Sequence, residues 1–356
     1  MIRKPKLPVI IPSKILFFIA LFAILAAGAS VAPAASPLEL RKAVQERLVH
    51  LQNVVVTYDM DVDYTPSQQA LEIVDKNLAL FKKSHPGANI GPTIRGHYRY
   101  ACRFSFLHGL MRYDKTTLPA TVAKLSLPPG VGIVKSILTI TPERAESLQY
   151  QLHFRKTPIG TIASRAALRG FLPIVWALGL WSPPFPPHDV VPHWLGNKAL
   201  HKMKLVKTGP DTFSLIQRRP SGYRCRWFFK SRPAIKLVGL NVSLRSHGIK
   251  RSIIKKGQCS DFHKIGGLLL PGRIVETSLF GKLGIGSTVT LTKIKYTIGA
   301  ATNTPKSYLI LWPTGSSVIN ERINHVFHIG VHRTYLTDKE IFSILRRQDR
   351  SGKIKH

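Results

Sequence analysis

Residues 53–64 read NVVVTYDMDVDY, and this stretch decides the fold class. Apolar side chains stand at every second position and polar ones alternate with them, with Val55 as the exception. The apolar set is Val54, Val56, Tyr58, Met60, Val62 and Tyr64, and the polar set is Asn53, Thr57, Asp59, Asp61 and Asp63. Because successive side chains of a β-strand point to opposite faces, the alternation predicts a strand with one buried face and one face in water.

A second strand of the same kind is expected between Arg95 and Phe106. One face carries Tyr98, Tyr100, Cys102, Phe104 and Phe106, and the other carries Arg95, His97, Arg99 and Arg103. If the two strands pair, Asp59, Asp61 and Asp63 lie opposite the arginines of the second, and such pairs contribute about 0.2–1 kcal/mol each. The Asp-x-Asp-x-Asp spacing also resembles a calcium loop. Tyr64 and Ala70 replace the glycine and the acid that such a loop requires, so calcium is not expected.

The rest of the chain predicts a long antiparallel meander. Further strands are expected over residues 133–140, 148–155, 212–218, 223–230, 235–244, 249–262, 268–280, 287–298, 307–312 and 325–330. Between residues 212 and 298 the connecting segments are too short for crossover helices, so these strands should pair with their neighbours in sequence. Apolar residues at helical spacing predict helices over residues 36–51 and 67–84.

Composition restricts the class of protein. The chain has 356 residues, with 52 Lys and Arg against 18 Asp and Glu, which gives a formal charge of +34 and a pI of about 10.5. Hydrophobic residues make up 44%, too many for a disordered chain. The three cysteines, Cys102, Cys225 and Cys259, are too few for a disulfide-rich scaffold, although a single disulfide between two of them stays open.

The N-terminal segment predicts export. Basic residues between Arg3 and Lys14 precede an apolar run, ILFFIALFAILAA, at residues 15–27, and Ala32-Pro33-Ala34 fits a signal-peptidase site. We expect residues 1–34 to be a cleaved signal peptide, with an uncleaved anchor as the alternative. In both cases the body is expected in the periplasm. Cleavage removes four basic residues, so the charge of +34 becomes about +30.

Export changes what the positive charge implies. An exported protein of this charge is expected to meet anionic lipid headgroups, lipopolysaccharide or acidic glycans, and not nucleic acid. The basic residues concentrate between Lys198 and Lys256, where sixteen Lys or Arg accompany one acid, Asp211. The alternative interpretation is a solvated basic face without a ligand.

Residues 169–187 interrupt the strand pattern with the sequence RGFLPIVWALGLWSPPFPP. The segment is too short and too rich in proline to span a membrane. A helix from Pro173 to Trp181 would be apolar on all sides, so we expect it to be buried or to face a membrane. It is either an ordinary core helix on the sheet or a lid over a lipid cavity, with Phe171, Trp176 and Trp181 as the candidate contacts.

No constellation of residues predicts catalysis, a metal or a cofactor. The glycine-rich turn at residues 281–288 lacks the lysine of a phosphate loop, and no G-x-S-x-G nucleophile elbow occurs. The cluster His325, His328 and His332 has no cysteine or carboxylate at ligand spacing. The pair His188-Asp189 has no nucleophile tied to it. We therefore expect a protein that is not an enzyme.

Three local patterns carry a resemblance to a known group. They are GLMRYD at residues 109–114, SDF at 260–262 followed by GGLLLPGRI at 266–274, and WPTGSSVINER at 312–322. With the signal sequence, the N-terminal helix and the meander, the chain resembles the LolA/LolB-like exported proteins, the outer-membrane lipoprotein sorting or carrier group, in a larger and divergent form. The resemblance covers roughly residues 38–330.

The resemblance implies an incomplete β-barrel, in which helices cover a strongly curved antiparallel sheet and lipoprotein acyl chains lodge in an apolar cavity. The expected fold class is therefore mainly β (α+β), with a half-barrel domain over residues 35–335 and a C-terminal helix and basic tail over residues 336–356. The expected partner is a lipoprotein acyl chain or a lipid. An anionic membrane surface is a further expected partner.

Apolar burial alone can hold such an acyl chain, without covalent chemistry. The candidate cavity residues from the two early strands are Val54, Val56, Tyr58, Met60, Tyr98, Tyr100, Phe104 and Phe106. We expect their side chains to line a hollow. The alternative function is a basic binding module for anionic lipid, lipopolysaccharide or acidic glycan, in which side chains fill the cavity.

Overall fold

The computed structural model describes residues 36–68, 96–118, 133–141, 145–151, 158–163, 173–179, 181–182, 193–194, 202–218, 222–232, 234–245, 252–279, 285–321 and 325–330, with single positions at 72, 75, 76, 79, 80, 83 and 343. Residues 1–36 form a unit of their own, and the fold below is that of the unit from Pro37 onward. The expected signal peptide, Phe171 and almost all of the expected C-terminal tail lie outside the described residues.

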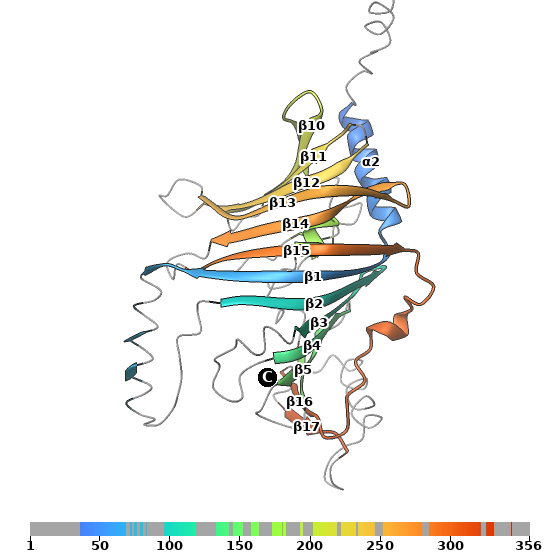
Figure 1. The fold of residues 1–356 in the computed structure, drawn as a ribbon. Coiled ribbons are helices and arrows are strands. Elements are labelled where there is room, and N and C mark those ends of the chain that lie inside the picture. Colours follow the sequence, from blue (N-terminus) through green and yellow to red (C-terminus); the bar gives the residue numbers. More distant parts are fainter. Residues whose placement is uncertain are drawn as a thin grey trace, which may run out of the picture. The chain divides into compact units, whose positions relative to one another are not determined.

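One sheet of fifteen strands dominates the described chain (Figure 1). From edge to edge its strands are β17 (His325–His328), β16 (Ser317–Asn320), β6 (Ile159–Ala163), β5 (Ala145–Gln151), β4 (Ile133–Ile140), β3 (Leu110–Thr117), β2 (Gly96–Leu107), β1 (Asn53–Pro66), β15 (Ile285–Ile298), β14 (Leu268–Leu279), β13 (Ser252–Ile265), β12 (Lys236–Leu244), β11 (Tyr223–Lys230), β10 (Thr212–Arg218) and β9 (Lys204–Lys207). The helices are α2 (Pro37–His50), α5 (Pro173–Ala177) and the 3₁₀-helix η2 (Pro305–Tyr308), and β7 (Trp181–Ser182) pairs with β8 (His193–Trp194).

The topology is two antiparallel meanders joined by β1. On one side β1 pairs with β2, and on the other it pairs with β15 from the far end of the chain. Among the described strands, only β16 runs parallel to a neighbour, β6. The sheet is curved, and its described edges, β9 and β17, are not paired with each other. The expected fold class, a mainly β, curved and open antiparallel sheet covered by a few helices, is confirmed.

The expected pairing of the aspartates with arginines of the second strand is confirmed at one of three positions: Asp61 faces Arg99, whereas Asp63 faces His97 and Asp59 faces Ala101. Asp61 lies opposite Arg99 and accepts a hydrogen bond from its Nε at 2.8 Å. Asp63 lies opposite His97, with 2.7 Å between the carboxylate and Nδ1. Asp59 instead contacts Lys293 of β15 at 2.9 Å. The three aspartates are therefore held by basic side chains of both neighbouring strands.

One expected strand is wrong. Residues 307–312 were expected to pair, but η2 occupies the first positions and the rest crosses a sheet face without joining a ladder. Tyr308, Ile310 and Trp312 are buried, whereas Leu311 is 82% exposed. An extended segment that lies on a surface has the same two-residue alternation as a strand, which explains the error. The short strands β3, β6, β9 and β16 were not predicted.

The two faces of the sheet have different covers. We call the face in contact with α2 and α5 the inner face. Trp176 of α5 contacts Glu276 of β14, and Arg47 of α2 contacts the Leu269 carbonyl of the same strand. Residues opposite each other in a ladder share a face. The pairs Glu276–Val289 and Val289–Val62 therefore carry the inner face across to β1.

The opposite, outer face has its own core at the β4–β17 side of the sheet. Leu148, Ile162, Val318 and Phe327 project from the strands and pack against Ile310, Trp312 and Ile329. Residues 300–316, which we call the strap, supply most of this cover. Gly160 allows the close approach, because a Cβ atom at that position would overlap the Trp312 ring.

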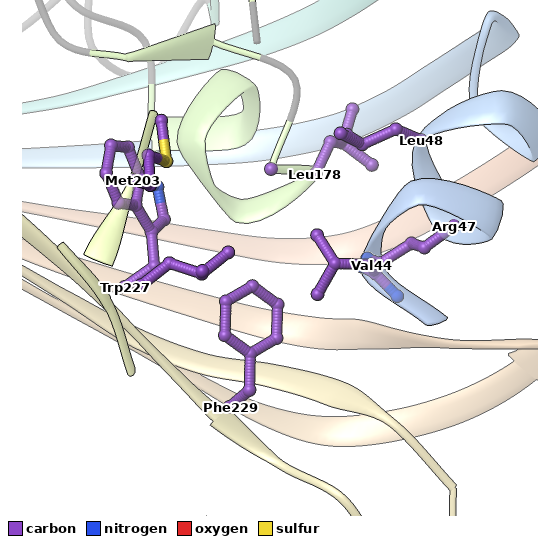
Figure 2. A pocket seen from close by; sticks show the side chains of 9 residues that line it. Val44, Arg47, Leu48, Leu178, Met203, Trp227 and Phe229 are labelled. Carbon is purple, nitrogen blue, oxygen red and sulfur yellow. The ribbon is translucent and has the colours of Figure 1, made fainter. Parts of the chain in front are cut away.

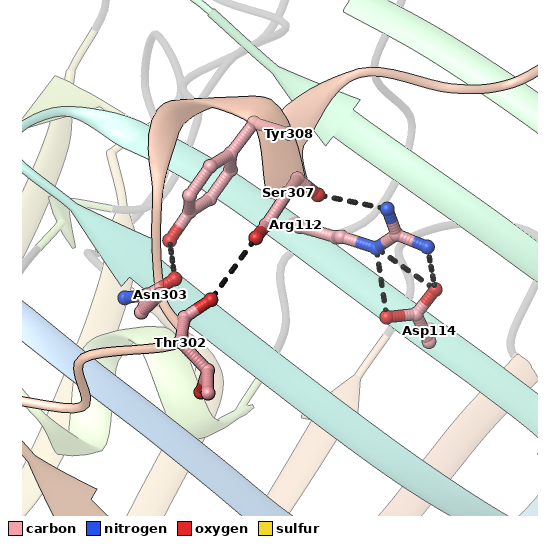
Figure 3. Close-up of polar contacts among 6 residues, drawn as sticks. All are labelled: Arg112, Asp114, Thr302, Asn303, Ser307 and Tyr308. Atoms are coloured by element: carbon pink, nitrogen blue, oxygen red, sulfur yellow. Dashed lines mark hydrogen bonds and ion pairs between the residues drawn. The ribbon is translucent and has the colours of Figure 1, made fainter.

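Polar contacts fix the strap to the sheet (Figure 3). Arg112 forms a bidentate pair with Asp114 and donates to the Ser307 carbonyl at 2.8 Å. The buried Asn303 amide donates to the Phe106 carbonyl, and its oxygen accepts from the Tyr308 hydroxyl at 2.8 Å. These bonds satisfy polar groups that the strap buries.

The helices follow their sequence signals. Pro37 begins α2, where its missing N–H costs no hydrogen bond, and Leu40, Val44 and Leu48 form its buried stripe. The expected helix at Pro173–Trp181 is shorter: α5 ends at Ala177, and Gly179 with φ of +75° terminates it. Within the described ranges, no helix is both long enough and apolar enough to cross a membrane. The three cysteines are free and buried.

Replacing Asn303 with Leu should lower the free energy of unfolding by about 1–3 kcal/mol, because the Phe106 carbonyl and the Tyr308 hydroxyl would stay buried without their partner. Urea unfolding followed by circular dichroism measures the change. The exposed strap residue Lys306, changed to Ala, is the control and should shift stability little. Equal stability of both variants would show that the strap does not depend on this network.

Candidate functional site

The helix α5 is anchored on the inner face by a buried carboxylate. Trp176 is fully buried, and its indole Nε1 donates to Glu276 at 2.7 Å. Glu276 is only 3% exposed and forms an ion pair with Lys255 of β13, also at 2.7 Å. A buried charge is tolerated when it is paired and hydrogen-bonded. The three side chains therefore act as a latch between α5 and the sheet, which we call the Trp176–Glu276–Lys255 latch.

Gly257 makes room for this latch. It lies opposite Glu276 on β13, and a Cβ atom added there would overlap the six-membered ring of Trp176. The indole therefore rests directly on the backbone of the strand. Glycine in a strand interior weakens it, and a close approach by another group is the usual reason for its presence.

The space between α2, α5 and the sheet is nearly filled (Figure 2). Val44, Arg47 and Leu48 enter from α2, Trp227 and Phe229 from β11, and Leu178, Gly179, Met203 and Leu215 complete the lining. The cavity measures about 10 Å³, roughly what one water molecule occupies. None of the candidate cavity residues of β1 and β2 is among its nine lining residues, and the tryptophan that lines it is Trp227.

Arg47 is the one strongly polar group in this lining. It is 1% exposed, and its Nη1 donates to the Leu269 carbonyl at 2.9 Å. Its Nε and Nη2 atoms have no hydrogen-bond partner within the described part of the chain. Burial lowers the pKa of Arg47 to about 10, opposed by the nearby Tyr296 and Cys259. The guanidinium is therefore still charged at neutral pH.

The structure places the candidate cavity residues of β1 and β2 on the inner face. Opposite partners are Val54 with Phe106, Val56 with Phe104, and Met60 with Tyr100. Val54, Val56, Phe104 and Phe106 are fully buried, Tyr58 and Met60 are nearly so, and Tyr98 and Tyr100 are half-buried. Trp176 contacts the inner face at β13 and β14 instead. The backbone of Trp181 belongs to β7, and its side chain lies outside the described set.

Cys102 is the sulfur on this face, and its surroundings keep it inert. Its Sγ lies 3.3 Å from the Tyr113 hydroxyl, which in turn contacts the Met60 sulfur. Burial raises the pKa of Cys102 to about 12. Because the thiolate is the nucleophilic form, the thiol is unreactive at neutral pH.

Sequence reasoning missed Arg47, Gly257, Glu276 and Lys255. Arg47 is one helical turn after Val44 on the apolar stripe of α2, so an arginine at a core position was visible in the pattern. Glu276 likewise shares the face of Ile274 in β14. A charge at a position that periodicity assigns to the core is the signal that finds both.

Comparisons with known proteins find similar structures but no similar sequences. No family model matches the chain, and no curated protein matches it by sequence. Solved structures do resemble it, among them three at 9% identity each. A lipoprotein-sorting protein domain from Vibrio parahaemolyticus, described as a putative outer membrane one, has a TM-score of 0.40 over 75% of this chain and 96% of its own. A DUF1329 family protein from Desulfovibrio piger has 0.40 over 78% and 100%.

The third structure is a LolA superfamily protein from Nitrosomonas europaea, with a TM-score of 0.37 over 76% of this chain and 99% of its own. The first and third of these structures carry names from the LolA/LolB-like group that the sequence motifs resemble.

Changing Gly257 to Ala should displace Trp176, because the new methyl group and the indole ring cannot occupy the same space. Overpacking of this kind costs about 1–3 kcal/mol. We expect a red shift in tryptophan fluorescence and lower stability to urea. In the control, Gly286 to Ala, the new Cβ would meet its neighbours at ordinary distances of 3.4 and 3.5 Å. An unchanged emission spectrum in the Gly257 variant would contradict the close packing of Trp176 against Gly257.

Changing Glu276 to Gln should lower the free energy of unfolding by about 3–5 kcal/mol, because Lys255 would lose its buried counter-ion. Adding Lys255→Met removes the uncompensated charge, so the double variant should recover part of the loss. Urea unfolding of the single and double variants gives the coupling energy between the two positions. Additive losses would show that the ion pair contributes nothing to the latch.

Proposed function

We propose that this chain is an exported, periplasmic carrier without catalytic activity, and that it binds acyl chains of lipoproteins or lipids on the inner face. The carrying observation is the small cover of the inner face: an apolar sheet face lies beneath a five-residue helix whose described polar anchor is the Trp176–Glu276–Lys255 latch. The N-terminal sequence supports export. The protonated Cys102 and the absence of a catalytic constellation in the sequence support the non-catalytic part.

The free energies of the protein's own cover and of an acyl ligand are of similar size. Moving Trp176 and its two or three apolar neighbours off the sheet costs on the order of 1.5–3 kcal/mol for each side chain. Each buried methylene of a ligand contributes about 0.8 kcal/mol, so a dozen contribute on the order of 10 kcal/mol. An acyl chain can therefore replace α5 on the inner face, and the filled cavity is the closed state of such a carrier.

The carrier should contain lipid or accept it. The protein purified without detergent is expected to show bound lipid by native mass spectrometry, and delipidated protein should take up a fluorescent fatty acid saturably. Gly257→Ala should accelerate uptake, because it displaces Trp176 from its seat, while Gly286→Ala should leave the rate unchanged. Lipid-free protein that takes up no fatty acid in any of these forms would exclude the carrier function.

Salt added to the same titration distinguishes the carrier from the alternative function, a basic module that binds anionic surfaces. Surface binding weakens steeply as the Debye length falls from about 10 Å at 0.1 M to about 3 Å at 1 M salt. Binding in an apolar interior should persist over this range. Loss of uptake at high salt would therefore favour the surface-binding alternative.

A further inference from the structure

The buried guanidinium of Arg47 has no counter-ion within the described part of the chain. One of its nitrogens donates to a main-chain carbonyl, and Nε and Nη2 are left without acceptors. The buried carboxylate of Glu276, also on the inner face, already has two partners, Lys255 and Trp176. A buried charge without a partner is strongly unfavourable, which makes this position exceptional.

The unused donors are the two that recognise planar anions. Nε and Nη2 form one edge of the guanidinium, with two parallel N–H groups in a fixed fork. This edge matches the two oxygens of a carboxylate or phosphate in a bidentate pair. Nη1, on the far side, is the atom that the Leu269 carbonyl already holds. The Leu269 carbonyl therefore fixes the guanidinium through Nη1 and leaves the edge formed by Nε and Nη2 available.

The cavity that Arg47 lines is apolar and short of acceptors. Val44, Leu48, Leu215 and Phe229 supply hydrocarbon walls. Trp227 lines the same cavity, and its indole Nε1 likewise has no acceptor within the described residues. Such a lining suits a ligand with oxygen atoms at one end and hydrocarbon beyond them.

We propose that this cavity binds the anionic head group of a single-chain amphiphile, with Nε and Nη2 of Arg47 on two oxygens of a carboxylate or phosphate and the alkyl chain on the inner face. This deepens the proposed function, on which it rests. At about 10 Å³ the cavity is the closed form of the site. Met203 and Leu178, which border it, must move aside, and a flexible Met suits that role.

The test compares matched probes on the delipidated full chain. Oleate and oleyl alcohol share one alkyl chain and differ in the charged head, and oleoyl lysophosphatidate adds a phosphate. Inorganic phosphate and acetate present the heads alone. Dissociation constants come from displacement of a fluorescent fatty acid and from calorimetry. We expect oleate to bind roughly tenfold or more tightly than oleyl alcohol, the effect of a charge-assisted bidentate pair.

Variants of α2 assign the preference to one side chain. Arg47→Met should bind oleyl alcohol as the wild type does and lose the preference for oleate. It should still fold, because replacing a buried charge by an apolar side chain is often neutral or stabilising. Arg47→Lys keeps the charge without the fork and should keep only part of the preference. The control is Lys42→Met, since Lys42 lies on the same helix and its side chain is exposed, where it pairs with Glu46.

The outcomes separate this proposal from the carrier function. If oleate and oleyl alcohol bind wild type equally, or if Arg47→Met keeps the preference, the head-group site is wrong and the carrier function stands. If no amphiphile binds, both are wrong. If inorganic phosphate binds in an Arg47-dependent manner and the alkyl chain adds no affinity, the site holds a small anion and the amphiphile proposal fails. Should Arg47→Met not fold, the wild-type probe series decides alone.

Discussion

The antiparallel ladder between β1 and β15 holds the two meanders together as one sheet. It places Val56 beside Tyr296 and Val62 beside Val289, although the segments are far apart in sequence. Without it the inner face would end at β1 on one side and at β15 on the other. The helix α2 leads directly into β1, so the same ladder brings Arg47 over β14. The position of every inner-face residue discussed above follows from this one pairing.

Two buried charges on the inner face differ in how they are compensated. Glu276 has a cation and an indole N–H at hydrogen-bond distance, so its charge is balanced inside the protein. Arg47 has one neutral carbonyl. Both lie in low-dielectric surroundings, where charge compensation contributes far more than it does in water. Glu276 is therefore a structural anchor for α5. Arg47 is one partner of the proposed ion pair, and the bound ligand is the other.

Alternation predicted the long strands because each has one buried and one exposed face. The strands β10 and β11 begin and end where the pattern placed them. Alternation wrongly predicted a strand in the strap, which alternates because it lies on the outer face. It missed β6 and β16 because they are too short to show a period. For the site, the pattern predicted the apolar residues of β1 and β2. The close approach of Trp176 to Gly257 depends on a fold that joins distant segments, so no local pattern contains it.

The excess of basic over acidic residues in the chain is a physical reason for the proposed head-group site. With 52 basic and 18 acidic residues, acids are scarce, and several described ones are already paired. These pairs are Asp61 with Arg99, Asp114 with Arg112, Asp59 with Lys293 and Glu276 with Lys255. An exposed lysine can do without a partner, because water solvates it. Arg47 is buried and has no such access to bulk water. An excess of cations is therefore harmless at the surface of this protein, and at one buried position it selects for an anion that no described residue provides.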